Sequence, residues 1–451
     1  MDNKIATVAL VQSKEDKAED ITDEQIKQLV QETVELAGGL GFIKDGQTVV
    51  VKPNIISTRA ITGQAASMRM ALPYADAYKD KSKLIPKEVN GITADYRVAQ
   101  ELTAMVREVN PTGKIYIMES SGDGATSKNL ELMGYIKENF PNVDEIISLD
   151  DTGNAYRNVD APDVVGVDPP ANQEYKKLAK WMKNKYYFDK KYYESDVVIS
   201  LCCLKNHMNA GFTGGIKNIG IGVMPQQIYR SFKNGSVVRG LTISHEFNDI
   251  SHFIHDYYSL KPADFVLLDG LQGLAYGPAA QGAPSYAAAK MNMRVMMASK
   301  DVVANDTIAA LIVGVDPHKV PYIKSLAKDG VGVTNLRKIV VKGNVRVDQI
   351  KKPFPFAKGV LSKVFRIPAG VAYDNYNPPK AKVKFINIAD GKLNAKLEVG
   401  EEVIKVEIYN EQSGLVGVVS KDFSEISVDF EGNKGVLIVY DNLLNAQKIE
   451  F

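Results

Sequence analysis

Residues 196–225 read DVVISLCCLKNHMNAGFTGGIKNIGIGVMP, and the rest of the chain is organised around them. The run 196–201 is rich in Val and Ile and predicts a buried β-strand. It leads into a polar corner at residues 205–207 and then into a glycine-rich loop. In parallel α/β sheets, ligands bind in the crevice at the carboxyl ends of the strands. The stretch therefore predicts a ligand site at one strand end of such a sheet.

The residues after this strand have the chemistry of a binding site. Glycines let the backbone approach a ligand, and consecutive free N–H groups can form a nest for an anion. We expect His207 to be the acid/base and Lys217 to contact an anion or a cofactor. The alternative is a turn whose polar groups cap the next helix. The other expected ligand contacts in the stretch are Lys205, Asn206, Gly211, Thr213, Gly214, Gly215 and Asn218.

Strand and helix patterns alternate on both sides of this stretch. Strands are predicted at 5–11, 48–51, 114–118, 145–149, 265–268, 292–298 and 337–341, and helices at 22–37, 95–109, 127–139, 245–258 and 301–312. Thr22 and Gln25 have the spacing of a capping box. The alternation predicts an α/β fold with a mainly parallel, doubly wound sheet over residues 1–345, in one or two lobes. Irregular insertions are expected near 57–92, where a lid is one interpretation, and near 151–194.

Polar side chains also follow three other predicted strands. They are Lys52 and Asn54, then Glu119, Ser120 and Ser121, and finally Asp269. Because the carboxyl ends of parallel strands share one edge of a sheet, we expect these side chains to meet around His207. Such a set suits a small polar or anionic ligand, or a hydrated divalent ion. The alternative is that each residue caps the helix after its strand.

The composition changes after about residue 345. Residues 346–380 contain KKPFPF and YNPPK and predict a Pro-rich connector. Residues 381–451 consist of short alternating runs separated by Asp-Gly and Gly-Asn turns, which is typical of a small antiparallel β-sandwich. This accessory domain contains no His or Cys. We therefore expect it to dock a partner or to form a homo-oligomer rather than to carry chemistry.

The bulk composition excludes several classes of function. The chain has 451 residues, with 55 Lys and Arg against 54 Asp and Glu, which argues against a nucleic-acid protein. No apolar run approaches the roughly 20 residues of a membrane span. Cys202 and Cys203 are adjacent and would point to opposite faces of a strand, so we expect no disulfide between them. An iron–sulfur cluster needs four thiolates at CxxC-type spacing, and the chain has no such motif. We expect a cytoplasmic protein, or an exported one whose targeting segment has been removed.

Five separated motifs resemble the family known as domain of unknown function 362 (DUF362). They are VVVKPNII (49–56), IMESSGDG (117–124), LKNHMNAGFTGGIKNI (204–219), LLDGLQG (267–273) and ASKDVVANDTIAALIVGVDP (298–317). The resemblance extends over about residues 5–345. Some members of that family carry ferredoxin segments that bind clusters, whereas this chain has none.

The central segment is also similar to the His-x9-Lys loop of the nickel-pincer lactate racemase family. In that family the histidine is an acid/base and the lysine anchors a nickel-carrying pyridinium cofactor. The resemblance places these roles on His207 and Lys217. The family also uses a second acid/base histidine upstream, and this chain has no histidine before His207. A nickel-ligand histidine follows the loop in that family, and His245 could fill this role at a different spacing.

The sequence thus indicates an enzyme that acts on a small anionic or carboxylate-like molecule at the carboxyl edge of a parallel sheet. A divalent metal or another cofactor could take part, with His245 as the candidate metal ligand. The alternative is a non-catalytic protein that binds a cofactor or metal and docks a partner through its C-terminal domain. Isomerase, racemase-like and redox-associated chemistry are all open at this point.

Overall fold

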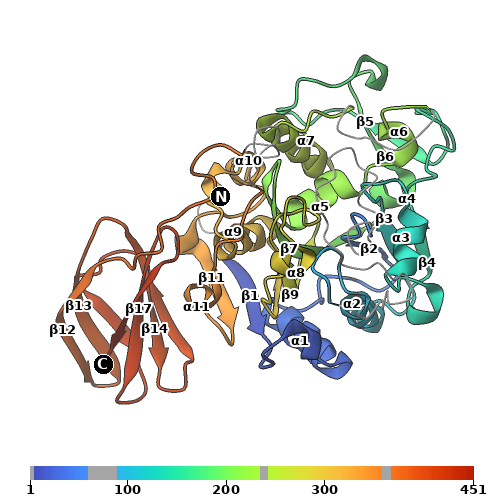
Figure 1. Cartoon of the computed structure of the whole chain (residues 1–451). Helices are drawn as coiled ribbons and strands as arrows, with labels where there is room; N and C mark the ends of the chain where they lie inside the picture. Colours follow the sequence, from blue (N-terminus) through green and yellow to red (C-terminus); the bar gives the residue numbers. More distant parts are fainter. Residues whose placement is uncertain (1–4, 59–88, 234–241, 358–366) are drawn as a thin grey trace.

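The computed structural model describes residues 5–58, 89–233, 242–357 and 367–451. A nine-stranded sheet forms its centre, with eight strands in the order β11-β1-β10-β9-β7-β2-β3-β4 and β8 paired to β7 (Figure 1). The strands of this sheet are β1 (Ala6–Gln12), β2 (Thr48–Pro53), β3 (Lys114–Glu119), β4 (Glu145–Ser148), β7 (Val197–His207), β8 (Gly211–Thr213), β9 (Phe265–Leu274), β10 (Val295–Ser299) and β11 (Ile339–Gly343).

The central stretch of the sequence contains the central strand of this sheet. β7 is parallel to β2 on one side and to β9 on the other, and β2, β3 and β4 continue the parallel arrangement. β10 is antiparallel to both of its neighbours, β1 and β9. The prediction of a mainly parallel α/β sheet is confirmed.

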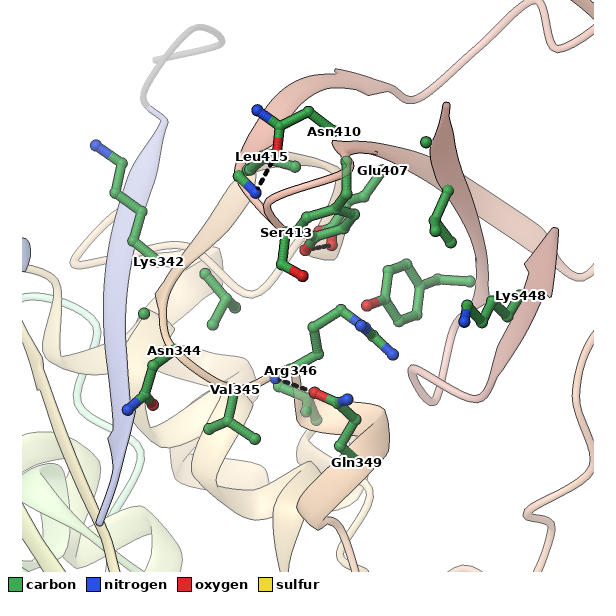
Figure 2. Close-up of a pocket in the computed structure, with 18 of the residues that line it drawn as sticks. Lys342, Asn344, Val345, Arg346, Gln349, Glu407, Asn410, Ser413, Leu415 and Lys448 are labelled. Atoms are coloured by element: carbon green, nitrogen blue, oxygen red, sulfur yellow. Dashed lines mark hydrogen bonds between the residues drawn. The ribbon is translucent and has the colours of Figure 1, made fainter. Parts of the chain in front are cut away.

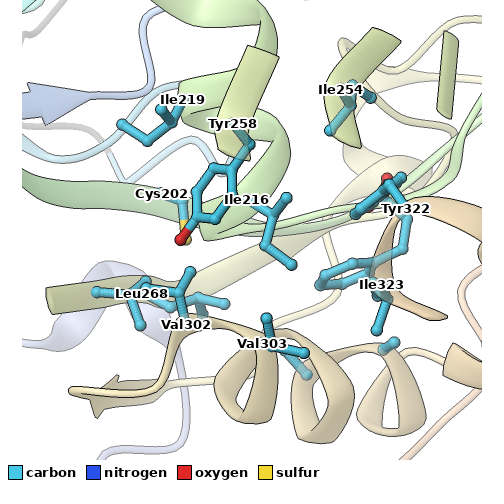
Figure 3. Packing of buried hydrophobic residues seen from close by; sticks show 14 of the residues in the cluster. Cys202, Ile216, Ile219, Ile254, Tyr258, Leu268, Val302, Val303, Tyr322 and Ile323 are labelled. Atoms are coloured by element: carbon cyan, nitrogen blue, oxygen red, sulfur yellow. The ribbon is translucent and has the colours of Figure 1, made fainter. Parts of the chain in front are cut away.

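Helices cover both faces of the sheet. The helices of the main body are α1 (Asp23–Leu36), α2 (Tyr96–Val109), α3 (Thr126–Leu132), α5 (Gly215–Gly222), α6 (Gln226–Tyr229), α7 (Phe247–Leu260), α8 (Tyr286–Ala289), α9 (Val302–Ile312), α10 (Pro321–Lys328) and α11 (Val347–Ile350). α1 and α2 pack on the face that includes Cys203, whereas α5, α7, α9 and α10 pack on the face that includes Cys202. Figure 3 shows Cys202 among Ile216, Tyr258 and Val302 on the second face.

The two cysteines are free and buried, as the period-two alternation of a strand requires. α9 is buried along its whole length, because it lies between the sheet and α5 and α10. A helix buried on all sides must be apolar throughout. Asn305 and Asp306 break that rule in α9 and therefore need internal partners.

Capping residues in the sequence predicted where helices begin more accurately than where they end. The capping box of Thr22 and Gln25 is present at the start of α1, and Asp95 caps α2. The helix predicted at 127–139 is too long, because α3 ends at Leu132. Gly134 follows with a φ of +81°, a left-handed conformation that ends the helix.

Two central strands are longer than their apolar runs predicted. β7 continues from the predicted 196–201 through the polar corner to His207, because β8 pairs antiparallel with its last residues. β9 likewise extends to Leu274, whose partner in β7 is Lys205. The polar residues of the predicted corner therefore lie on a strand, where their backbones are held by hydrogen bonds on the sheet.

The insertion predicted near 151–194 contains the antiparallel pair β5 (Val164–Val167) and β6 (Tyr186–Asp189), followed by α4 (Lys190–Tyr193). Most of the insertion predicted near 57–92, with its interpretation as a lid, lies outside the described residues. Among the described helices, none combines the length and the apolar character needed to cross a bilayer.

The C-terminal strands form two antiparallel sheets that lie at one end of the molecule (Figure 1). One has the order β12-β13-β16 and the other β15-β14-β17-β18. The strands are β12 (Ala381–Ala389), β13 (Lys392–Val399), β14 (Val403–Asn410), β15 (Leu415–Val419), β16 (Ile426–Asp429), β17 (Gly435–Asp441) and β18 (Ala446–Glu450). A shared apolar cluster joins the two sheets, as in a β-sandwich.

Candidate functional site

The carboxyl ends of β2, β3, β7 and β9 meet at one edge of the sheet. Parallel registers place Lys52 beside Ser200, and Asp269 beside Cys203. This is the edge where α/β sheets bind ligands. The arrangement brings together polar residues that are more than 200 positions apart in the sequence, from Lys52 to Asp269.

A buried ion pair joins β2 to β3. The Lys52 Nζ atom lies 3.1 and 3.0 Å from the two carboxylate oxygens of Glu119, and both side chains are 1% exposed. The Glu119 carboxylate also accepts hydrogen bonds from the backbone N–H groups of Ile55 and Ser120, at 2.7 and 2.8 Å. These donors compensate the buried negative charge, which is expensive to leave unpaired.

Asn218 of α5 connects this pair to the neighbouring strands. Its Oδ1 accepts from Lys52 Nζ at 2.8 Å and from Asn54 Nδ2 at 3.1 Å. Its Nδ2 donates to the carbonyl of Lys52 at 3.0 Å and to the Ser200 hydroxyl at 3.1 Å. The helix that follows the glycine loop is thereby fixed to the strand ends through one amide.

Lys205 is a fully buried cation whose two hydrogen-bond partners are neutral oxygens, while the charges of Glu119 and Asp269 act on it without a direct bond. Its Nζ donates to Asn54 Oδ1 at 2.5 Å and to the carbonyl of Ile92 at 2.8 Å. Burial lowers the pKa of Lys205, since desolvation disfavours the ammonium form. Within the described residues, these two oxygens account for two of its three protons.

Asp269, at the end of the apolar part of β9, is a weaker acid than an ordinary carboxyl group. Its Oδ2 accepts from the N–H of Asp95 at 2.9 Å, and its Oδ1 accepts from the N–H of Leu271 at 3.0 Å. Burial, followed by the nearby charge of Asp95, raises the pKa of Asp269 to about 6. A group with this pKa changes protonation close to neutral pH.

The hydrogen bonds of His207 define its tautomer. Nδ1 faces the N–H groups of Asn209 and Ala210, at 3.1 and 3.3 Å, so it must be the accepting nitrogen. The ring proton therefore sits on Nε2. Burial depresses the pKa of His207 well below its usual range. The charge of Lys217 acts in the same direction, as does that of His245 when it is protonated, which places both near the imidazole.

His245 carries a proton on the other ring nitrogen. Its Nδ1 lies 2.8 Å from the carbonyl of Ile243, which can only accept, so Nδ1 is the donor. The side chain of Asn209 donates to the His245 carbonyl at 2.9 Å and so ties this segment to the turn after β7. The orientation is one that metal-binding histidines adopt. The described residues contain no group of three or more His, Cys, Asp or Glu side chains placed to hold a metal ion.

The expected anion nest in the glycine loop is already occupied by the protein itself, and this corrects the prediction. The Asp306 carboxylate accepts from the N–H groups of Gly215 and Ile216, at 2.8 and 2.9 Å, at the start of α5. Burial raises the pKa of Asp306 to about 7. A Cβ atom at position 214 would lie 2.4 Å from Asp306 Oδ1. Gly214 is thus required for the approach of α9, and these donors are not available to a ligand.

Asp306 is the site residue that the sequence interpretation missed. Its signal was present, because an Asn-Asp pair at 305–306 interrupts an otherwise apolar helical run. A buried carboxyl group of this kind needs donors, and helix N-termini supply them. The pattern shows that Asp306 needs a partner, whereas the tertiary structure shows which one it has.

Several other expected ligand contacts have structural partners. The hydroxyl of Ser120 donates to the Met224 carbonyl at 2.6 Å, and that of Ser121 donates to the Ile55 carbonyl at 2.5 Å. Asn206 donates to the carbonyls of Phe354 and Pro355, both at 2.9 Å, and accepts from the N–H of Gly277 at 2.9 Å. These bonds hold loops from distant parts of the chain against the strand ends.

The remaining expected residues lie on or beside the glycine loop. Gly211 and Thr213 belong to β8, where Thr213 is opposite Lys205 and Gly211 has a φ of +76°. Lys217 lies in the first turn of α5 and is 7% exposed, and His207 is 4% exposed. Both groups are therefore largely shielded from solvent within the described part of the chain.

The fold and this edge define an α/β protein whose parallel strands bring buried lysines, amides and carboxyl groups together at one edge of the sheet. Residues 84–311 match the family model Domain of unknown function (DUF362). The chain belongs to the DUF362 family.

Comparison with solved structures gives weak similarities. The lactate racemase apoprotein from Thermoanaerobacterium thermosaccharolyticum is similar over 67% of this chain and 57% of its own, with 14% identity and a TM-score of 0.31. The catalytic module of the metalloprotease ZmpA from Clostridium perfringens is similar over 33% and 28%, with 13% identity and a TM-score of 0.15. The matched region is thus little more than half of the racemase chain. Similarities of this size support no inference about activity. No curated protein matches the sequence.

Proposed function

We propose that this protein is an enzyme that binds a small carboxylate-like or otherwise anionic molecule at the carboxyl edge of its parallel sheet. The observation that carries the proposal is the buried ammonium of Lys205, which has only neutral oxygens as hydrogen-bond partners among the described residues. A buried cation without a bonded counter-charge is costly, and an anionic ligand would supply that charge. Lys52 does not fill this role, because Glu119 already neutralises it.

The neighbouring groups suit the same ligand. Lys217 adds a second positive charge near His207. The Nε2–H of neutral His207 is a hydrogen-bond donor, and using Nε2 as a base would require the ring proton to move to Nδ1, against two amide donors. We therefore assign His207 a donor role toward the bound anion. Asp269, with a pKa of about 6, is the better matched group for proton transfer.

Calorimetry tests the binding step with three probes: L-lactate, malonate and inorganic phosphate. Lys205→Met and Lys217→Met remove the two charges, and Lys128→Met is the matched control, since Lys128 is exposed on α3. We expect at least one probe to bind, with affinity at least tenfold lower in each of the two site variants and unchanged in the control. Folded site variants that bind the probes as tightly as the unmodified protein would refute the proposal.

The proton-transfer role of Asp269 has a separate test. Asp269→Asn keeps an oxygen acceptor and removes the titratable group. Once a binding probe is known, exchange of its carbon-bound hydrogen with deuterated water can be followed by NMR. We expect exchange in the unmodified protein to depend on a group with a pKa near 6 and to be lost in the variant. Exchange that persists in Asp269→Asn would assign the role to another residue.

A further inference from the structure

A large cavity lies between the main sheet and the C-terminal strands, away from the glycine loop. Its volume is about 840 Å³, and β11, the turn before α11, β14, β17 and β18 line it. This volume is in the range of sites for small molecules, roughly 300–1,000 Å³. Figure 2 shows the Arg346 side chain extending into this space, with Lys448 on the strand beyond it.

Two charge networks, one half-buried and one buried, form the floor of the cavity. In the first, Arg346 donates through Nε and Nη2 to the two oxygens of Asp348, at 3.1 and 3.0 Å, and the Tyr440 hydroxyl donates to Asp348 Oδ1 at 3.0 Å. In the second, Lys405 donates to Glu407 Oε1 and the Tyr409 hydroxyl donates to Glu407 Oε2, both at 2.7 Å. Lys405 and Glu407 are 2% and 5% exposed.

The floor therefore has more hydrogen-bond donors than the described part of the protein has acceptors for them. Each carboxylate oxygen of Asp348 and Glu407 already accepts a hydrogen bond, and both tyrosine protons are committed. Within the described residues, Nη1 of Arg346 donates to no protein acceptor, and the Lys405 ammonium makes one hydrogen bond and lies 5.2 Å from the centroid of the Tyr440 ring. A guanidinium edge and an ammonium group in the same cavity can each take further acceptor atoms, and an oxyanion supplies several at once.

Exposed lysines at the rim of the cavity add to its preference for an oxyanion. Lys342, Lys434 and Lys448 also line the cavity and are exposed, while the rim acids are Glu411 and Glu450. Glu450 is paired with Lys448 at 2.6 Å. The positive charges of the rim exceed the negative ones, so the cavity attracts anions and can hold more than the anionic group alone.

We propose that this cavity binds a small organic oxyanion, a phosphate monoester or a carboxylate, through Arg346 and Lys405 on its floor. The site is separate from the strand-end site, so either proposal can fail without the other. The volume exceeds that of a single phosphate, and the polar groups Asn410 and Ser413 that line it can contact the body of the ligand.

Calorimetry with three related probes tests the proposal on the full chain: glucose, gluconate and glucose 6-phosphate. We expect one or both of the anions to bind and glucose to show no binding. Inorganic phosphate serves as a fourth probe and should bind more weakly than glucose 6-phosphate, because it fills less of the cavity. Failure of all anions to bind, or equal affinity for glucose and the anions, would overturn the proposal.

Variants then locate the binding. Arg346→Gln removes the guanidinium and should reduce affinity at least tenfold. Because this change also releases Asp348, the rim variant Lys434→Glu with Lys448→Glu provides a second test on exposed residues, with an expected loss of at least fivefold. Its control is Lys396→Glu with Lys421→Glu, which makes the same change in net charge on exposed residues outside the cavity lining.

The control and rim variants together separate a site from a general charge effect. Affinity that is unchanged in the control and reduced in the rim variant supports a site at this cavity. Equal reductions in the two double variants would show that net charge alone governs binding and would overturn the proposal, as would full binding in a folded Arg346→Gln protein. The strand-end variants Lys205→Met and Lys217→Met should leave the binding of gluconate and glucose 6-phosphate at this cavity unchanged.

Discussion

The buried pair of Lys52 and Glu119 allows a quantitative test of how the strand ends are held together. Glu119→Gln leaves the ammonium of Lys52 buried without its counter-charge. Removing one partner of a buried pair costs about 3–5 kcal/mol. The Glu119 carboxylate also accepts from two backbone N–H groups, and a Gln side chain can accept only one of them through its oxygen. We therefore expect Glu119→Gln to lower the free energy of unfolding by about 4–6 kcal/mol.

Lys52→Met removes the other partner at similar volume. It leaves Glu119 with its two backbone donors and leaves the Asn218 Oδ1 atom with the Asn54 donor. We expect a loss of about 3–4 kcal/mol, because the carboxylate keeps part of its compensation. The double variant lacks both charges, so its loss should be smaller than the sum of the single losses by about 2–3 kcal/mol.

Urea unfolding, followed by circular dichroism, measures all four corners of this cycle. The exposed pair of Lys191 and Glu145, with side chains 51% and 50% exposed, is the matched control. The coupling energy of an exposed pair is typically below about 1 kcal/mol. Additive losses at Lys52 and Glu119, or a coupling no larger than that of the exposed pair, would refute the conclusion that this buried pair holds β2 to β3.

Three further predictions follow from the same geometry. The folded state keeps His207 neutral, so the free energy of unfolding should not depend on this residue above about pH 6.5 and should fall as the pH drops below that value, where the unfolded chain gains the proton. Nitrogen NMR should show the Nε2–H tautomer at pH 7, and an imidazole of the folded protein that titrates near 6.5 would contradict the assignment. Gly222→Ala would place a Cβ atom 2.3 Å from Lys52 Nζ and should lower the thermal unfolding midpoint by several degrees. Gly41→Ala is the control, because a Cβ atom there meets nothing within 4 Å, and equal midpoints for the two variants would contradict the close packing of Gly222 against Lys52. Burial raises the pKa of Cys203 to about 12, so a thiol reagent at pH 8 should label it only after unfolding, and rapid labelling of the native protein would disprove its burial.

The architecture could be predicted from the sequence to a considerable extent. Apolar runs separated by amphipathic helices gave the mainly parallel α/β sheet, and the alternating runs after residue 381 gave antiparallel C-terminal sheets. These features depend on local periodicity, which a single sequence displays directly. The antiparallel direction of β10 could not be read in this way, because a strand carries the same residue pattern whichever way it runs.

The ends of elements were predicted less well, since they depend on contacts. α3 ends at Leu132, just before Gly134, whose positive φ is a local cause that the sequence contained. The extension of β7 to His207 has a tertiary cause, because the polar residues 205–207 remain extended through their pairing with β8. Hydrophobic periodicity carries no information about such a pairing.

The sequence by itself determined which residue types follow each strand, and parallel topology then required them to share one edge. It could not determine which of them bond to one another. Asp306 is the anion at the start of α5, and Glu119 is the partner of Lys52. The two members of each pair are 67 or more residues apart in the chain, so the pairing depends on how distant helices and strands come together. Hydrogen bonds act over about 3 Å, so only the folded arrangement decides which donors are satisfied internally and which remain for a ligand.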